Sequence, residues 1–225
     1  MSKLLDRVAD ASGVLYVLLV FGGYVFLVAP FMPESLDSPD AALAHLQSHP
    51  PTTAFWAGVW LEGAGLAVLV FFAARIAARI RTAQPGWWLP SAALGLAVAA
   101  STVKIGSFAP GLAALEIDRL DAQSVTTLLS ANDAAVGVSG ALDGGFVLLL
   151  GLGALAVGGL PRWLAALTLA AGTGQVLSVA VPALDSLSLL FFGWALVASG
   201  WLLARGTRSR STDTAIPVDA ARRTA

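Results

Sequence analysis

The sequence has no cysteine, only two histidines and few charged residues. Without cysteine, the chain has no disulfide bond, no thiolate nucleophile and no thiolate-bound metal. Lys, Arg, Asp and Glu make up 12% of the 225 residues, whereas hydrophobic residues make up 57%. This composition lies outside the range of soluble globular proteins and predicts a chain that resides in a lipid bilayer.

The few basic residues are too scattered to form the continuous basic face that a nucleic acid needs, so we expect no nucleic-acid partner. The sequence also indicates no cofactor and no metal site. His45 and His49 have the spacing of two metal ligands on one helix face. That spacing is common, however, and His49 precedes a proline, which disfavours helical geometry at that residue.

Six apolar runs are long enough to cross about 30 Å of hydrocarbon as α-helices. They cover approximately residues 13–33, 53–74, 88–109, 134–159, 162–181 and 185–204. The runs are rich in Ala, Leu and Gly and lack the period-two alternation of a membrane β-barrel. The predicted fold is therefore all-α, a polytopic bundle of six transmembrane helices in one domain over residues 1–204. The polar residues 205–225 are predicted to form a disordered cytoplasmic tail.

Lys and Arg are concentrated in the loops on one side of this topology. With a cytoplasmic N-terminus, only Arg119 lies outside and only Lys104 lies within a span. The positive-inside rule therefore predicts a multi-pass protein of the cell membrane with both termini in the cytoplasm. The apolar run that ends near Phe31 is too long for a signal-peptide core, so we interpret it as a retained first span.

Two parts of the chain share a sequence pattern. The sequence Leu-Glu-Gly-Ala at 61–64 corresponds to Leu-Asp-Gly-Gly at 142–145. The Leu-Pro pairs at 89–90 and 160–161 each begin an apolar run, and the two runs align without a gap. This alignment places Lys104 opposite Gln175. We therefore predict a parallel internal repeat, in which spans two and three correspond to spans four and five.

Glu62 and Asp143 are ionisable residues inside apolar spans. Such residues usually face a protein interior or a functional cavity. The repeat places both at similar depth and brings them toward one another, so we predict that they form a catalytic pair of acid and base. The alternative is that each carboxyl group is satisfied locally within a packing network between helices.

Lys104 has two interpretations. Its side chain can snorkel to the membrane interface, or it can form a salt bridge with one of the two acids. A salt bridge would keep that acid ionised and divide the pair into one base and one acid. Gln175 would then provide a neutral hydrogen-bonding counterpart in the second half of the repeat.

Deeply placed aromatic residues are expected to line a substrate pocket around the acids, where aromatic faces stabilise a cation. These residues are Trp60, Phe146, Phe191, Phe192 and Trp194. Asp133 and Asp185 lie at predicted outer span ends and are interpreted as helix caps. A short outer helix is expected to begin at Ser38-Pro39-Asp40 and to end before Pro50.

Three motifs carry a resemblance to a known group of proteins. They are Ala11-Ser12-Gly13-Val14-Leu15-Tyr16, Asn132-Asp133-Ala134-Ala135 with Ala141-Leu142-Asp143-Gly144, and Leu160-Pro161-Arg162-Trp163-Leu164. They resemble small six-helix bacterial membrane proteins, mostly actinobacterial, that are classed as a domain of unknown function. The resemblance implies fold and membrane location but no catalytic residues. The paired acids also have a functional analogy, without a shared motif, to integral-membrane terpene cyclases, which protonate an alkene or an epoxide.

The leading functional hypothesis is a membrane-bound enzyme of cyclase or isomerase type. It would protonate a lipophilic, isoprenoid-like substrate by intramembrane general acid catalysis. The alternatives are a proton-coupled carrier of small solutes and a non-catalytic membrane accessory protein. The expected partners are the lipid bilayer and a lipophilic small molecule. The sequence does not identify the substrate or the oligomeric state, and a homo-oligomer is one of the open alternatives.

The arginine distribution makes a testable prediction about topology. Reporter fusions after Arg81 and in the C-terminal tail should read cytoplasmic, and fusions near Ser48 and Gln123 should read external, because basic loops stay on the cytoplasmic side. Paired cytoplasmic and external reporters at each position provide the control. A cytoplasmic signal at Ser48 would contradict the orientation.

Overall fold

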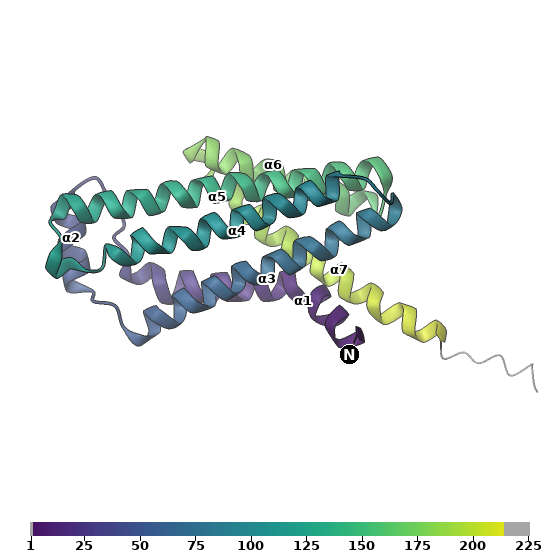
Figure 1. The fold of residues 1–225 in the computed structure, drawn as a ribbon, viewed down its shortest axis with the longest axis horizontal. Helices are drawn as coiled ribbons and strands as arrows, with labels where there is room; N and C mark the ends of the chain where they lie inside the picture. The colour runs from purple at the N-terminus through teal and green to yellow at the C-terminus, as the bar shows by residue number, and fades with distance from the viewer. Residues whose placement is uncertain (1, 214–225) are drawn as a thin grey trace, which may run out of the picture.

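A computed structural model of the chain describes residues 2–213, with side chains over residues 4–205. Every regular element within residues 2–213 is a helix (Figure 1). The α-helices are α1 Ser2–Val20, α2 Pro39–Ser48, α3 Thr53–Ala83, α4 Leu89–Ala113, α5 Ala122–Val157, α6 Arg162–Ala180 and α7 Leu189–Asp213. The shorter helices are η1 Phe21–Val28, η2 Ala29–Phe31, η3 Ile117–Arg119 and η4 Pro182–Ser188.

Six helical segments within the described residues are long and apolar enough to cross a membrane. They are Leu4–Phe31, Thr53–Ala83, Leu89–Ala113, Ala122–Val157, Arg162–Ala180 and Pro182–Arg205. The prediction of an all-α bundle with six spans is confirmed, and the chain is a multi-pass membrane protein. Helix α7 continues past the predicted domain boundary at residue 204, and the predicted tail residues 214–225 lie outside the described residues.

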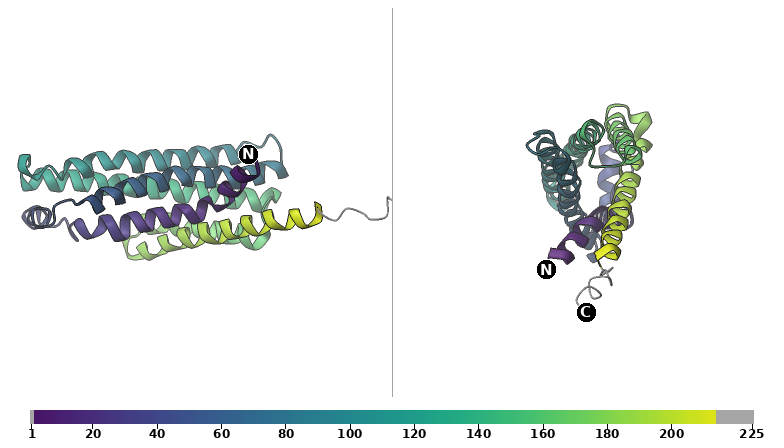
Figure 2. Two further views of the ribbon diagram at one scale, coloured as in Figure 1. Left: turned by 90° about the horizontal axis from the view of Figure 1, so that it is seen from below. Right: turned by 90° about the vertical axis from the view of Figure 1, so that its right-hand side faces the viewer.

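The six spans close into a ring. Helix α3 packs against α1 and α4, α5 packs against α4 and α6, and α7 packs against α6 and α1. Each span therefore contacts the next span in the sequence, and the last contacts the first. The start of α1 and the end of α7 lie toward one end of the bundle, and α2 lies at the opposite end (Figures 1 and 2).

An apolar core fills part of the ring interior. Phe72, Phe146, Leu150 and Trp194 are fully buried within one continuous hydrophobic cluster. Trp194 Nε1 donates a hydrogen bond of 2.9 Å to Thr168 Oγ1, so the one polar atom of this large side chain is satisfied. The cluster draws on α1, α3, α4, α5, α6 and α7 and closes the middle of the bundle.

Helix α5 is longer than its membrane-crossing part. Its 36 residues span about 54 Å at 1.5 Å per residue, more than the roughly 30 Å of a bilayer core. The first turns project beyond that core and pack on α2, where Val125 and Leu129 are buried with Leu46. Asp121 caps α5 by accepting a 2.7 Å hydrogen bond from the Ser124 N–H, and hydrogen bonds from Ser124 lower the pKa of Asp121.

Asp133 is therefore not a helix cap, contrary to the sequence prediction. Because α5 begins at Ala122, Asp133 lies within the helix. The short outer helix agrees with its prediction: Ser38 caps α2, Pro39 is its first residue and the helix ends at Ser48. The rings of His45 and His49 stack with centroids 4.3 Å apart. No group of three His, Cys, Asp or Glu side chains within the described part of the chain is placed to hold a metal ion.

The first span changes from α-helix to π-helix at Phe21, and the π-helix η1 then packs against α3. Gly23 and Gly58 form the closest crossing between these two elements. A Cβ atom on either glycine would lie 2.7 Å from the carbonyl oxygen of the other. Such a distance leaves no room for a side chain at the crossing. A π-helical turn inside a longer helix often marks a functional region.

We expect Gly58→Ala to lower the melting temperature in detergent. Alanine favours a helix interior over glycine by about 1 kcal/mol, but here the added methyl group would collide with Gly23 and Leu27. Overpacking of this kind typically costs about 1–3 kcal/mol. Gly106→Ala in α4 is the matched control, because its Cβ would meet no atom within 4 Å. An equal rise in melting temperature for both variants would contradict the close crossing.

Candidate functional site

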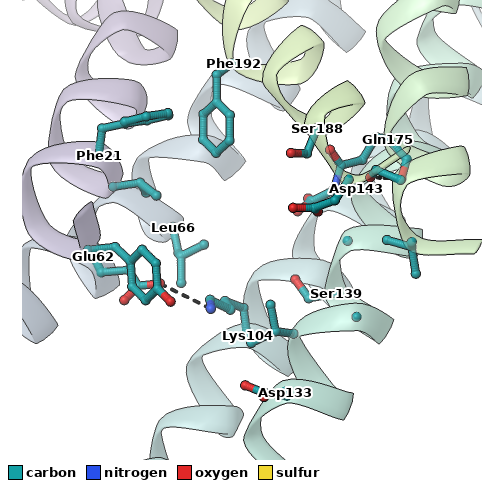
Figure 3. Close-up of a pocket in the computed structure, with 18 of the residues that line it drawn as sticks. Phe21, Glu62, Leu66, Lys104, Asp133, Ser139, Asp143, Gln175, Ser188 and Phe192 are labelled. Carbon is teal, nitrogen blue, oxygen red and sulfur yellow. Dashed lines mark hydrogen bonds and ion pairs between the residues drawn. The ribbon is translucent and has the colours of Figure 1, made fainter. Parts of the chain in front are cut away.

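The ring of spans surrounds a cavity of about 530 Å³, a volume within the roughly 300–1,000 Å³ typical of small-molecule sites. Its polar lining residues are Tyr16, Tyr24, Glu62, Lys104, Asn132, Asp133, Ser139, Asp143, Gln175, Ser178, Asp185 and Ser188. Apolar residues that include Val20, Phe21, Leu66, Val136 and Phe192 complete the lining. All six spans therefore contribute side chains to one amphipathic compartment (Figure 3).

The cavity has a buried floor and an exposed rim. Tyr16, Leu66 and Asp143 are buried, whereas Asp133 and Asp185 on the rim are exposed. The apolar core, which includes Phe146 and Trp194, packs next to the floor and belongs to the same bundle interior. The cavity is thus accessible from the α2 half of the bundle, and the packed core separates it from the other half.

Glu62 is held by Lys104 on one side of the cavity. The Lys104 Nζ atom lies 3.3 Å from Glu62 Oε1, and 4% of the Glu62 surface is exposed. Nζ also lies 5.8 Å from the centre of the Tyr24 ring, within the range of a cation–π contact. Of the two interpretations of Lys104, the structure shows the salt bridge. Glu62 therefore has a charged partner.

Asp143 lies across the cavity from this ion pair, next to Gln175 and Ser188 (Figure 3). Its Oδ1 atom is buried and has no hydrogen-bond partner among the described residues, and the same holds for Gln175 Oε1. The two acids predicted from the sequence thus share one cavity, but Glu62 is paired with Lys104 rather than with Asp143. One acid has a cationic partner at hydrogen-bond distance, and the other has a buried oxygen with no partner among the described residues.

The predicted repeat accounts for this difference. Ser107 Oγ donates a hydrogen bond to the Lys104 carbonyl at 2.7 Å, and Ser178 Oγ donates the equivalent bond to the Gln175 carbonyl at 2.8 Å. The corresponding positions therefore have the same local geometry and both line the cavity. They differ in charge, because the first half has lysine where the second half has glutamine. Superposition of the two halves stays a prediction.

The cavity as a whole is acidic. Four carboxyl side chains line it, from Glu62, Asp133, Asp143 and Asp185, and Lys104 is the basic side chain among its lining residues. Asp185, like Asp133, faces the cavity rim rather than serving as the predicted cap: it lies inside the short helix η4. A compartment with this charge favours ligands that carry or develop positive charge.

Four of the aromatic residues predicted to line the pocket do not do so. Trp60 is 78% exposed, because a separation of two residues rotates it by about 200° from Glu62 on the same helix. Phe146, Phe191 and Trp194 are instead packed together in the apolar core, with ring centroids about 6 Å apart. Phe192 and Gln175 do line the cavity, as predicted.

The sequence prediction also missed the contribution of the first span. Tyr16 is buried on the cavity floor, and its ring stacks on Phe192 with centroids 5.8 Å apart. Tyr24 lies on η1 above Lys104. Tyr16 and Tyr24 are the only tyrosines of the chain and stand eight residues apart in the first span. That clustering, together with Gly22 and Gly23 between them, was the available signal.

Comparisons of the chain with protein-family models, with curated proteins and with solved structures returned no match. The resemblance to six-helix actinobacterial proteins therefore stays a prediction.

We expect Lys104→Met to destabilise the protein strongly. Removal of one partner of a buried ion pair leaves an uncompensated charge and typically costs about 3–5 kcal/mol. The double variant Lys104→Met/Glu62→Gln should regain most of this loss, because it removes both charges. Thermal unfolding in detergent measures the effect, with Thr102→Val on the exposed face of α4 as control. Equal destabilisation in the single and double variants would contradict a stabilising role for charge pairing.

Proposed function

We propose that the chain is an integral membrane enzyme that acts on a lipophilic substrate by intramembrane general acid catalysis, in the manner of a terpene cyclase. The observation that supports the proposal is that the two acids, Glu62 and Asp143, have different surroundings. Glu62 has a cationic partner at 3.3 Å, and Asp143 has a buried oxygen without a partner on the opposite side of the same cavity. Two carboxyl groups in different environments are a common arrangement for an acid and a base.

In this proposal Asp143 is the general acid. Its side chain lies at the cavity floor, and its buried Oδ1 atom has no hydrogen-bond partner among the described residues, so a proton on this carboxyl group would be available to a substrate atom in the cavity. Glu62, which lies 3.3 Å from the Lys104 Nζ atom, is the base that receives a proton from the cationic intermediate, and this transfer gives the product. Proton transfer by a positioned side chain typically contributes about 10²- to 10⁴-fold to a rate.

The lining supports a substrate with a large apolar part. Val20, Phe21, Leu66 and Phe192 form apolar walls around the acids. The parallel stack of Tyr16 and Phe192 places aromatic faces at the floor, where they stabilise positive charge that develops on a substrate. An isoprenoid chain satisfies these requirements and is the substrate class that we propose.

The access route also supports a lipophilic substrate. Helix η1 packs against α3, whereas η4 packs against α6, and both contribute to the cavity rim. In Figure 1 the first and last spans meet near the termini and diverge toward α2. Exposed Val25 and Val179 line the cavity on these two sides, so a substrate dissolved in the bilayer would meet apolar side chains first.

A proton-coupled carrier is the second candidate, and the acidic cavity inside the bundle favours it. A carrier needs a route to both sides of the membrane, however, and the packed core of Phe72, Phe146 and Trp194 fills the ring beside the cavity. This one-sided access is what an enzyme requires and what an alternating-access carrier shows in one of its states, so the assay below separates the two. We further propose that the protein resides in the cell membrane with both termini in the cytoplasm, so that the cavity opens toward the outer side.

We expect Asp143→Asn and Glu62→Gln each to reduce turnover by about 10²- to 10⁴-fold, because an amide keeps the shape of the side chain but cannot donate or accept the catalytic proton. The assay mixes purified protein in detergent with a polyprenyl substrate and its epoxide and measures cyclised or isomerised product. Asp118→Asn is the matched control, because Asp118 is exposed in the loop helix η3, away from the cavity.

Retention of full activity in Asp143→Asn would refute its role as the acid. The same assay separates the two candidate functions, because detergent solution has no second compartment. Protein that transforms nothing in detergent but takes up solute into proteoliposomes under a pH gradient would show that the carrier function is correct and the enzyme function is wrong.

A further inference from the structure

We infer that the substrate presents a basic oxygen or nitrogen atom to Asp143, rather than a carbon–carbon double bond. The inference rests on the proposed function, since it names the class of substrate that the same site takes. Its basis is the hydrogen-bonding character of the side chains around Asp143, which an alkene and a heteroatom would satisfy differently once protonated.

Two side chains that line the cavity near Asp143 have hydrogen-bond acceptors that no described residue pairs. Asp143 Oδ1 and Gln175 Oε1 are both buried and have no hydrogen-bond partner among the described residues. The Gln175 amide nitrogen is placed toward Gly140, 3.1 Å from the position of a Cβ there. Buried polar atoms without partners are uncommon and costly, so a ligand that donates hydrogen bonds to them would stabilise the site.

The neighbouring serines strengthen this pattern. Ser139 Oγ donates its hydrogen to the Ala100 carbonyl at 3.0 Å, and Ser178 Oγ donates its hydrogen to the Gln175 carbonyl at 2.8 Å. Each hydroxyl group has one hydrogen to donate. Both serines line the cavity, and with that hydrogen committed they can only accept from a ligand. The region around Asp143 therefore calls for a ligand that donates hydrogen bonds.

The proton-transfer step distinguishes the two substrate classes. The O–H bond of the Asp143 carboxyl group breaks, and a new O–H or N–H bond forms on the substrate. Asp143 becomes a carboxylate, and the substrate group becomes a cation that carries hydrogen-bond donors. Those donors can bond to Asp143 and to Gln175 Oε1. A protonated double bond gives a carbocation without an O–H or N–H group, so the acceptor of Gln175 would stay unpaired, which is costly in a buried site.

The acidic lining agrees with a positively charged ligand but does not by itself identify its donors. Glu62 is already paired with Lys104, so the carboxyl group near the floor without a cationic partner among the described residues is that of Asp143. A primary ammonium group offers three donors, and a quaternary ammonium group of equal charge offers none. Binding of stable cations with and without hydrogen-bond donors therefore distinguishes the contribution of hydrogen bonding to affinity from that of charge.

The test measures the binding of octylammonium, octyltrimethylammonium and 1-octanol to purified full-length protein in a neutral detergent by titration calorimetry. We expect octylammonium to bind at least about tenfold more tightly than either of the others, because hydrogen bonds to charged groups are strong. Octyltrimethylammonium that binds as well as octylammonium would overturn the inference, since charge alone would then suffice. Equal binding of 1-octanol would also overturn it.

Two variants of α6 sharpen the test. Gln175→Met keeps the length of the side chain and removes the acceptor, so the preference for octylammonium over octyltrimethylammonium should fall by about tenfold while the binding of octyltrimethylammonium stays unchanged. Thr173→Val, on the exposed face of the same helix, should leave both affinities unchanged. An undiminished preference in Gln175→Met would overturn the assignment of Gln175 Oε1 as an acceptor.

The result is distinguishable from failure of the proposed function. If no substrate is transformed but the preference for octylammonium holds, the enzyme proposal fails while recognition of a donor-bearing cation stands. If the enzyme transforms a polyprenyl alkene but not its epoxide, the enzyme proposal stands and the inference about the substrate atom is wrong.

Discussion

The hydrocarbon of a bilayer offers no water to a charged side chain, and this constraint organises the molecule. A charge inside the membrane must be paired or must face a polar compartment. The ring of six spans provides one such compartment, and Glu62, Lys104 and Asp143 all face it. Toward the other end, Arg75 bonds Asp10 at 2.7 Å and thereby ties α3 to the first span. Apolar side chains fill the ring between these two polar regions.

The two halves of the repeat satisfy this constraint to different degrees. Lys104 in the first half occupies the position that aligns with Gln175 in the second half. A serine three residues later donates a hydrogen bond to the backbone carbonyl of each. The salt bridge between Glu62 and Lys104 therefore has no equivalent at Asp143. If the two halves superpose as predicted, the lysine-to-glutamine difference at this one position accounts for one paired and one unpaired acid.

The spans and the buried acids could be predicted from sequence because both follow from strong, local physical rules. Apolar length determines which segments cross the membrane, and an ionisable residue in an apolar helix must face inward, as Glu62 and Asp143 do. Pocket aromatics could not be identified in this way. A membrane helix is apolar on its lipid-facing and core-facing sides alike, so no amphipathic pattern reveals that Trp60 faces outward while Phe192 faces the cavity. The extended start of α5 also escaped prediction, because it depends on tertiary packing against α2.

Asp143 Oδ1 has no partner among the described residues, although the same fold pairs the other buried acid, Glu62, with a lysine. Lys104 shows that a lysine at this position of the repeat reaches its acid and neutralises it at 3.3 Å. If the two halves superpose as predicted, a lysine in place of Gln175 would pair with Asp143 in the same way. The second half instead keeps a neutral acceptor beside a buried carboxyl group, an arrangement that costs stability when no ligand is present. Under the proposed function, a ligand that donates a hydrogen bond and accepts a proton would offset that cost, because it would pair both oxygens when Asp143 becomes charged.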